Sequence, residues 1–125
     1  MIKLSVIVPF YGVEKYIARC AESLMRQTTQ DDVEFIFVND ATKDNSFDVL
    51  QKVLTEYPER EEQVTILHHE RNKGLPAARN TSLSIAKGKN IYHCDSDDYL
   101  ERDVLEVLYR KADENKSDIV MERFL

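Results

Sequence analysis

Short, nearly continuous apolar runs alternate with longer amphipathic segments along this chain. An apolar run without polar alternation is typical of a strand that is buried on both faces of a parallel sheet. Apolar residues that recur every three or four positions indicate a helix that packs on such a sheet. The predicted strands span residues 3–9, 33–38, 64–67, 89–94 and 118–121. The predicted helices span residues 13–26, 46–57 and 76–87, with a fourth helix inside 99–115.

Strands that alternate with helices favour a parallel sheet covered by helices on both faces, which is a three-layer α/β/α sandwich. Residues 44–46 offer caps for the second helix, and Gly88 offers a stop for the third. The charged stretch 58–63 is interpreted as a solvated surface turn. The pattern therefore predicts an α/β fold in which each strand end opens into a loop.

Composition limits the classes of function. The 125 residues are enough for one domain, and 42% hydrophobic with 32% charged residues is ordinary for a globular protein. The net charge of −6 argues against a nucleic acid as partner. Cys20 and Cys94 are too few for a disulfide framework, favour a reducing cytoplasmic compartment and are interpreted as inert packing residues. The apolar run 4–10 is too short for a signal peptide or a membrane span.

Polar and aromatic residues follow three of the predicted strands directly. They are Pro9-Phe10-Tyr11, Asn39-Asp40 and Asp95-Ser96-Asp97-Asp98. Ligands of open α/β sheets bind outside the carboxyl ends of the strands, so the three strand ends are expected to converge on one crevice.

The last of these segments concentrates three carboxylates within four residues. Asp95 and Asp97 are two apart and would share one face of a strand, where a cation between them relieves their repulsion. Mg²⁺ is often held by one or two carboxylates together with substrate phosphates. The alternative is a loop and helix start in which Asp98 serves as a cap. From these residues alone, both interpretations stay open.

Four blocks in fixed order carry a resemblance to a known family. They are Pro9-Phe10-Tyr11-Gly12-Val13-Glu14, Phe37-Val38-Asn39-Asp40-Ala41-Thr42-Lys43-Asp44, Asn72-Lys73-Gly74-Leu75-Pro76-Ala77-Ala78-Arg79-Asn80 and the Asp95–Asp98 segment. Together they resemble the N-terminal, donor-binding part of a family 2 glycosyltransferase with the Rossmann-like GT-A fold. Gly12 replaces the usual Asn and Ala41 the usual Gly, changes that we expect to affect a local turn rather than a ligand contact.

The resemblance implies roles on the nucleotide side of the crevice. Pro9 and Tyr11 would line the base and ribose pocket, with Tyr11 stacked on uracil, a contact that contributes about 1–3 kcal/mol. Asp40 would accept a hydrogen bond from the imide N–H of the base. The alternatives are that Tyr11 is a half-buried residue at a strand end and that Asp40 is a turn aspartate.

On the phosphate side, the resemblance makes Asp97 the ligand of a divalent metal, Mn²⁺ or Mg²⁺, with Asp95 as a further metal or ribose contact in a DXD motif. Arg79 would reach the nucleotide from the third helix, unless it is an ordinary solvated arginine. Gly74 would permit the close or left-handed backbone before that helix.

The implied function is metal-assisted, inverting transfer of a sugar from a nucleoside-diphosphate sugar, expected to be a UDP-sugar, to an unknown saccharide or lipid-linked acceptor in polysaccharide biosynthesis. Residues 1–125 would form the nucleotide-sugar-binding domain of a longer enzyme that can lie peripheral to the membrane. The general base that inversion requires would come from beyond this chain, so the chain alone would only bind the donor.

Other functions are weighed against this one. A receiver-type signalling domain needs an acidic pair after the first strand, and a sugar-nucleotide pyrophosphorylase needs an early glycine-rich loop; neither is present. A non-catalytic nucleotide-binding or scaffold module stays open. His68 and His69 are adjacent on a strand and point to opposite faces, which disfavours joint metal chelation. The apolar end of the chain, 117–125, is predicted to associate weakly with another copy through an open sheet edge.

Overall fold

A five-stranded sheet in the order β3-β2-β1-β4-β5 organises the computed structural model, which describes residues 2–29, 32–114 and 120–122. All four pairs of neighbouring strands are parallel. The strands are β1 (Leu4–Phe10), β2 (Val33–Asn39), β3 (Val64–His68), β4 (Asn90–His93) and β5 (Val120–Glu122).

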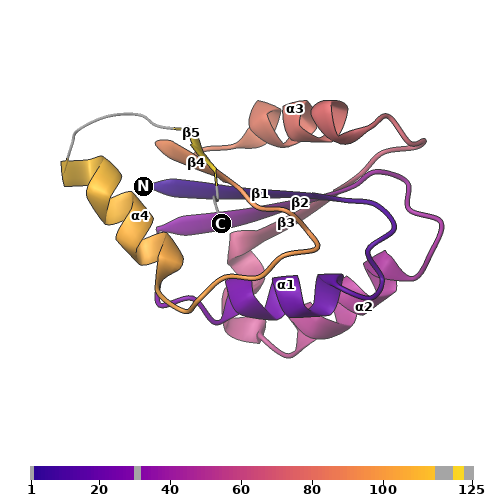
Figure 1. Cartoon of the computed structure of the whole chain (residues 1–125), viewed down its shortest axis with the longest axis horizontal. Helices are drawn as coiled ribbons and strands as arrows, with labels where there is room; N and C mark the ends of the chain where they lie inside the picture. Colours follow the sequence, from indigo (N-terminus) through magenta and orange to yellow (C-terminus); the bar gives the residue numbers. More distant parts are fainter. Residues whose placement is uncertain (1, 30–31, 115–119, 123–125) are drawn as a thin grey trace.

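Helices cover both faces of this sheet, as the alternating pattern predicts. They are α1 (Ile17–Met25), α2 (Ser46–Thr55), α3 (Leu75–Ile85) and α4 (Val104–Glu114), with a 3₁₀ helix η1 (Pro58–Gln63) before β3. In Figure 1, α1 and α2 lie on one face and α3 on the other. The three-layer α/β/α architecture expected from the sequence is confirmed.

The direction in which the chain crosses the sheet explains this arrangement. From β1 to β2 to β3 the chain moves steadily outward, and α3 then carries it back past β1 to β4. Crossover connections between parallel strands are right-handed, so reversing the direction of travel places α3 on the face opposite to α1 and α2. The reversal creates a topological switch point between β1 and β4.

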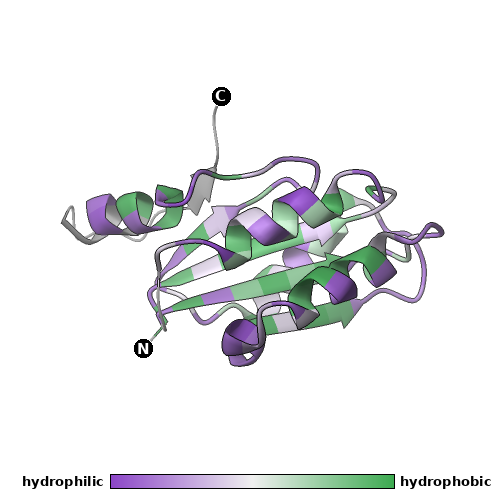
Figure 2. Ribbon diagram, turned by 90° about the horizontal axis from the view of Figure 1, so that it is seen from below, coloured by the Kyte–Doolittle hydropathy of each residue, from purple (hydrophilic) through white to green (hydrophobic). Residues whose placement is uncertain are grey.

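The core is split by the sheet, and β1 contributes to both halves because every one of its residues is buried. Leu4, Val6, Val8 and Phe10 pack toward α1 and α2 in the larger cluster. Ile7 packs with Ala78 of α3 in the smaller one. The sheet coloured by hydropathy in Figure 2 is accordingly mainly hydrophobic. This pattern confirms strands that are buried on both faces.

One helix begins later than predicted and another begins within its predicted range, and at both starts side chains from distant segments bind the backbone. α1 begins at Ile17 rather than 13, and the N–H groups of 12–14 donate to side chains of the 42–46 loop. α4 begins at Val104, inside the predicted range 99–115. There the buried Gln27 side chain donates to the Glu101 carbonyl (2.5 Å) and accepts from the Leu105 N–H (3.0 Å).

One local prediction is wrong and another is incomplete, both for packing reasons. Gly88 does not end α3, which ends at Ile85. Instead a Cβ at position 88 would lie 2.5 Å from the backbone nitrogen of Ser5, so only glycine allows this close approach. The 58–63 stretch is not simply solvated either. Its Arg60 is buried and donates to the carbonyls of Met25, Gln27 and Thr29.

Part of the C-terminal segment lies outside the described residues. Residues 115–119 and 123–125 belong to this part, so only 120–122 of the region predicted to self-associate are described, as strand β5 paired with β4. That association stays a prediction. Within the described ranges, no helix combines the length and apolar character that crossing a membrane requires.

Candidate functional site

A cleft of about 290 Å³ opens at the switch point between the carboxyl ends of β1 and β4. Its lining comprises Pro9, Tyr11, Val13, Leu75, Arg79, His93, Cys94, Asp95, Ser96 and Asp97. Five of these residues were selected from the sequence as site residues: Pro9, Tyr11, Arg79, Asp95 and Asp97. Three segments that are far apart in the chain therefore meet in one concave site.

The acidic residues of the cleft sit on a turn rather than on an extended strand. β4 ends at His93, and the Asp98 N–H donates to the Asp95 carbonyl over 3.1 Å. Asp95 and Asp97 are exposed while Ser96 between them is buried. Asp98 accepts from the Tyr99 N–H (2.9 Å) and is not the cap of α4, which begins six residues later at Val104. Asp95 and Asp97 thus line the cleft, whereas the Asp98 carboxylate binds the backbone of its own turn.

The two exposed carboxylates fit a divalent cation that is shared with a ligand. In the described part of the chain, neither side chain enters an ion pair, and no cluster of three or more His, Cys, Asp or Glu side chains could hold a metal alone. Two carboxylates without further protein ligands suit Mg²⁺ or Mn²⁺ that completes its coordination with water and phosphate oxygens.

Arg79 enters the same cleft from α3, on the opposite side of the sheet from α1. Its Nε is inaccessible and has no hydrogen-bond partner among the described residues. A buried donor without an acceptor costs roughly 1–3 kcal/mol, and a polar or anionic ligand in the cleft could supply that acceptor. Arginine suits this task because its guanidinium stays ionised and donates in a planar fork.

The remaining wall of the cleft is apolar and aromatic. The Tyr11 side chain is 41% exposed and Leu75, the first residue of α3, is 49% exposed. Sequence reasoning did not select Leu75, although its place just after Gly74 in a matched block was a usable signal. A half-exposed ring beside a cluster of carboxylates and an arginine provides a surface on which a planar ring can stack.

Asp40 and Gly74 do not line the cleft but contact each other beside it. The Asp40 side chain is 2% exposed. Its Oδ1 accepts from the Lys73 N–H and pairs with His69 Nδ1 (2.9 and 2.8 Å), and its Oδ2 accepts from the Gly74 N–H (2.9 Å). Burial alone would raise the pKa of Asp40, but these hydrogen bonds outweigh it and lower the pKa. Gly74 has φ of 94°, the left-handed backbone predicted for it.

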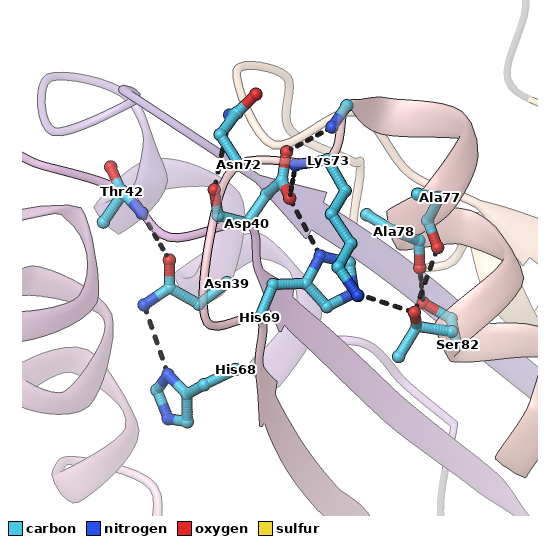
Figure 3. Close-up of polar contacts among 12 residues, drawn as sticks. Asn39, Asp40, Thr42, His68, His69, Asn72, Lys73, Ala77, Ala78 and Ser82 are labelled. Atoms are coloured by element: carbon cyan, nitrogen blue, oxygen red, sulfur yellow. Dashed lines mark hydrogen bonds and ion pairs between the residues drawn. The ribbon is translucent and has the colours of Figure 1, made fainter.

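The neighbouring histidines point to different partners (Figure 3). His69 bridges Asp40 and Thr81 of α3, with Nε2 2.7 Å from the Thr81 hydroxyl oxygen. His68 instead contacts the Asn39 amide at 3.2 Å. The opposite orientation predicted for an adjacent pair is confirmed. The bridging role of His69 was missed, because its partners lie 29 and 12 positions away and leave no local signal.

Both cysteines are buried, as predicted, and they meet behind the acidic turn. The sulfurs of Cys20 and Cys94 lie 3.9 Å apart, and each is 3.7 Å from the Asp95 carbonyl. The hydrogen bond with Cys20 and burial both raise the pKa of Cys94 well above its ordinary value. A neutral thiol is a poor nucleophile, which agrees with a packing role.

A second hollow, of about 420 Å³, lies between α2, η1 and β3. It is larger than the cleft but contains none of the site residues selected from the sequence. Most of its lining is apolar, with Met25, Leu54, Val64 and Ile66 among the contributing side chains. The grouped carboxylates, the arginine and the exposed tyrosine therefore single out the smaller cleft as the functional site.

Comparison with known sequences agrees with this geometry. Residues 5–124 match the family described as Glycosyl transferase family 2. The chain is 39% identical to the uncharacterized glycosyltransferase EpsJ of Bacillus subtilis over 94% of its own length and 32% of that protein. It is 38% identical to the poly(ribitol-phosphate) beta-glucosyltransferase of Bacillus spizizenii over 95% of its length and 18% of that protein.

Solved structures of glycosyltransferases are also similar to this chain. TarS 1-349 of S. aureus in complex with UDP-GlcNAc superimposes with a TM-score of 0.82 at 32% identity, covering 94% of this chain and 33% of that one. The mannosyltransferase PcManGT of Pyrobaculum calidifontis, in complex with GDP-Man and Mn²⁺, gives 0.76 at 25% identity over 82% and 30% of the two chains. The chain thus spans about a third or less of each of these four proteins. It belongs to glycosyltransferase family 2 and has the GT-A fold of these structures.

Proposed function

We propose that this chain binds a nucleoside-diphosphate sugar, a UDP-sugar by preference, in the cleft between β1 and β4. It would form the donor side of an enzyme that transfers the sugar to an acceptor. The observation that supports this most strongly is the convergence of Tyr11, Arg79, Asp95 and Asp97 in one cleft from three separate segments. Nucleotides bind at such switch points in parallel sheets because strand ends and loops from both directions meet there.

The lining suggests how the ligand lies. Its base would stack on Tyr11 and its ribose would lie near Pro9 and Asp95, because these residues form the β1 side of the cleft and its border with the acidic turn. Arg79 would donate to the nucleotide, giving its buried Nε the acceptor that it lacks among the described residues. Asp40 would discriminate the base by accepting a hydrogen bond from its imide N–H. The acceptor would be Oδ2, which accepts only the Gly74 N–H in this structure and so keeps one lone pair for the base.

A divalent ion, Mn²⁺ or Mg²⁺, would be held by Asp97 with Asp95 and by oxygens of the diphosphate. Such an ion neutralises charge that develops on a leaving diphosphate. PcManGT, a mannosyltransferase, is in complex with GDP-Man and Mn²⁺, and TarS 1-349 with UDP-GlcNAc, which supports the class of ligand but leaves the sugar and the base to experiment. Without the ion, Asp95 and Asp97 would repel the diphosphate.

The acceptor, a saccharide or a lipid-linked molecule, would approach from the open side of the cleft. Inversion at the anomeric carbon requires a base that removes the acceptor proton. We place that base outside this chain, as the resemblance implies. The chain alone would then bind donor but lack the proton acceptor, a contribution typically worth about 10²–10⁴-fold in rate. Acceptor-dependent release of UDP by residues 1–125 would overturn this placement.

Calorimetric titration with UDP, CDP and GDP, each with and without MnCl₂, tests the proposal. We expect UDP to bind most tightly and Mn²⁺ to strengthen its binding at least about tenfold, since the metal bridges two carboxylates and the diphosphate. Asp97→Asn should remove the metal dependence, whereas Asp98→Asn, the matched control on the same turn, should retain it.

The outcomes separate the open alternatives. Metal-linked binding of UDP that disappears in Asp97→Asn supports the donor site. A binding module without catalytic metal would bind nucleotide equally with and without Mn²⁺, and a scaffold would bind none. Equal metal enhancement in Asp97→Asn and in the unaltered chain would remove Asp97 as the ligand.

A further inference from the structure

Two loops beside the cleft are joined by a set of hydrogen bonds that the proposed donor site does not itself use. Residues 12–14 lie shortly after β1, and residues 42–46 lead into α2, which begins at Ser46. The Gly12 N–H donates to Thr42 Oγ1 (2.9 Å), the Val13 N–H to Ser46 Oγ (2.9 Å) and the Glu14 N–H to Asp44 Oδ2 (3.3 Å). The Asn45 N–H donates back to Glu14 Oε1 (3.0 Å). We call this set of contacts the loop clasp.

Asp44 determines in which direction the hydroxyl groups of the loop clasp donate their hydrogen bonds. Its Oδ1 accepts from the Thr42 hydroxyl (2.7 Å) and from the Ser46 hydroxyl (2.6 Å). A carboxylate can only accept, so both hydroxyl protons point to Asp44 and both hydroxyl oxygens are left to accept from the backbone of 12–14. Without Asp44, nothing in these contacts would hold the two hydroxyls in that orientation.

The ionisation state of Asp44 agrees with this role. Burial would by itself raise the pKa of its carboxyl. The hydrogen bonds from the Ser46 and Thr42 hydroxyls and from the Ser46 and Glu14 N–H groups outweigh burial and lower the pKa to about 2. The carboxylate therefore stays charged, and acts as an acceptor, at every pH at which the nucleotide would be assayed.

The backbone that the loop clasp holds is the one that carries Tyr11. Gly12 has φ of 63°, and a Cβ at that position would meet no atom within 4 Å, so its backbone has open space on that side. Tyr11 itself is 41% exposed at the edge of the cleft. The hydrogen bonds of the next three residues, together with the Asp40 N–H that donates to the Phe10 carbonyl (3.0 Å), hold the backbone on both sides of the tyrosine.

We propose that Asp44 is a positioning residue for donor binding, which holds residues 12–14 through Thr42 and Ser46 and so keeps the Tyr11 ring where the base would stack. This inference rests on the proposed donor site. Asp44 also has a structural role, because its Oδ1 accepts from the Ser46 N–H (3.0 Å) at the start of α2. The proposed positioning role is separate from this one. The experiment must separate the two roles.

A double-mutant cycle does so by combining Asp44→Asn with Tyr11→Ala. An amide offers one acceptor oxygen where the loop clasp needs two, so Asp44→Asn should weaken UDP binding in Mn²⁺ by about three- to tenfold, the usual size of a lost hydrogen bond. In the Tyr11→Ala background the same change should weaken binding by less than about twofold, because the positioned ring is already absent. Urea unfolding should give the same loss of stability for Asp44→Asn in both backgrounds.

Control variants keep the test sharp. Asp48→Asn removes one negative charge from the exposed first turn of α2 and should leave UDP affinity unchanged. Thr42→Val deletes the acceptor for the Gly12 N–H, and Thr42→Ser restores it, so this pair repeats the test if Asp44→Asn does not fold. Thr42→Val should weaken UDP binding and Thr42→Ser should not.

The possible failures are distinct. An equal loss of UDP affinity from Asp44→Asn with and without Tyr11, or no loss at all, would overturn the positioning role while leaving the donor site intact. Absence of any UDP binding by the unaltered chain would overturn the proposed function, and the positioning role with it. Non-additive loss of binding together with additive loss of stability is the result expected for a positioning residue.

Discussion

The acidic residues at the end of β2 and those after β4 are chemically alike but are used in opposite ways. Asp40 and Asp44 each accept several hydrogen bonds from their own protein, and both have lowered pKa values. Asp95 and Asp97 are exposed, line the cleft and enter no ion pair in the described part of the chain. Carboxylates that accept mainly from their own protein hold loops in place, whereas exposed ones are available to a metal or ligand.

The largest expected difference is in the free energy of unfolding, when one internally bonded carboxylate and one exposed carboxylate are each replaced by an amide. Asp40→Asn places an amide N–H₂ against a ring of donors from His69, Lys73 and Gly74. We expect it to lower the free energy of unfolding by about 2–4 kcal/mol, the cost of breaking a buried, paired group.

Asp97→Asn is the matched partner on the other side, and it should change the free energy of unfolding by less than about 0.5 kcal/mol because its side chain is exposed. Urea denaturation of both variants at pH 7 gives the two values. Equal destabilisation by the two substitutions would contradict the division into structural and ligand-binding carboxylates.

A smaller effect is expected in acid, where protonation of an internally bonded carboxylate should lower the free energy of unfolding. The folded-state pKa of Asp44 is about 2, below the ordinary value of 3.8. A group with a depressed folded pKa contributes stability that is present above the unfolded pKa and is lost as pH falls through the folded one. Between about pH 4 and pH 2 the chain should therefore lose on the order of 1–2 kcal/mol through Asp44.

Denaturant unfolding measured across this pH range tests the contribution. Asp44→Asn should flatten the stability curve there. A curve of the same steepness in Asp44→Asn would show that other groups carry the acid dependence.

The smallest effect concerns the backbone that joins the two internal carboxylates. Ala41, between Asp40 and Asp44, has φ of 60° and is the one non-glycine residue with positive φ in the described ranges. Its Cβ makes that backbone unfavourable, so Ala41→Gly should stabilise the chain by about 0.5–1 kcal/mol, after the extra entropy of glycine in the unfolded chain is allowed for.

A thermal unfolding scan of Ala41→Gly against the unaltered chain measures this gain. Gly12→Ala makes the reverse change in a left-handed position with open space around it, and it should destabilise by a similar amount. Destabilisation by Ala41→Gly would mean that the alanine methyl makes a packing contribution that exceeds its backbone cost.

The fold followed from the sequence where the signal was local. The apolar runs located all five strands to within one or two residues at most ends, because burial on both faces leaves few polar positions. The strand-end logic also selected Tyr11, Asp95 and Asp97, which line the cleft. Ala41, which stands where the family usually has glycine, has a left-handed φ of 60°, and the expected effect on the local turn stays a prediction.

What the sequence did not reveal depends on partners that are distant in the chain. The late start of α1 reflects hydrogen bonds about 30 positions away, and the exact start of α4 depends on the Gln27 side chain 78 positions before Leu105. Arg60 looked solvated because its three carbonyl partners lie 31 to 35 residues upstream. The spacing of Asp44 and Ser46 did carry a local signal, since aspartates often bind the backbone two residues on.

The position of β1 at the switch point also governs the order in which the molecule can assemble during synthesis. Leu4 pairs with Val33 on one side and with Asn90 on the other. A nascent chain that has emerged only as far as β3 can form a three-stranded sheet, but one edge of β1 stays open until β4 arrives. Closing that long connection costs entropy before its contacts form, so we expect the acidic turn to join Tyr11 in a late, slow step. Until then, the edge of β1 that will frame the cleft is open to pairing with another chain, as is the outer edge of β3.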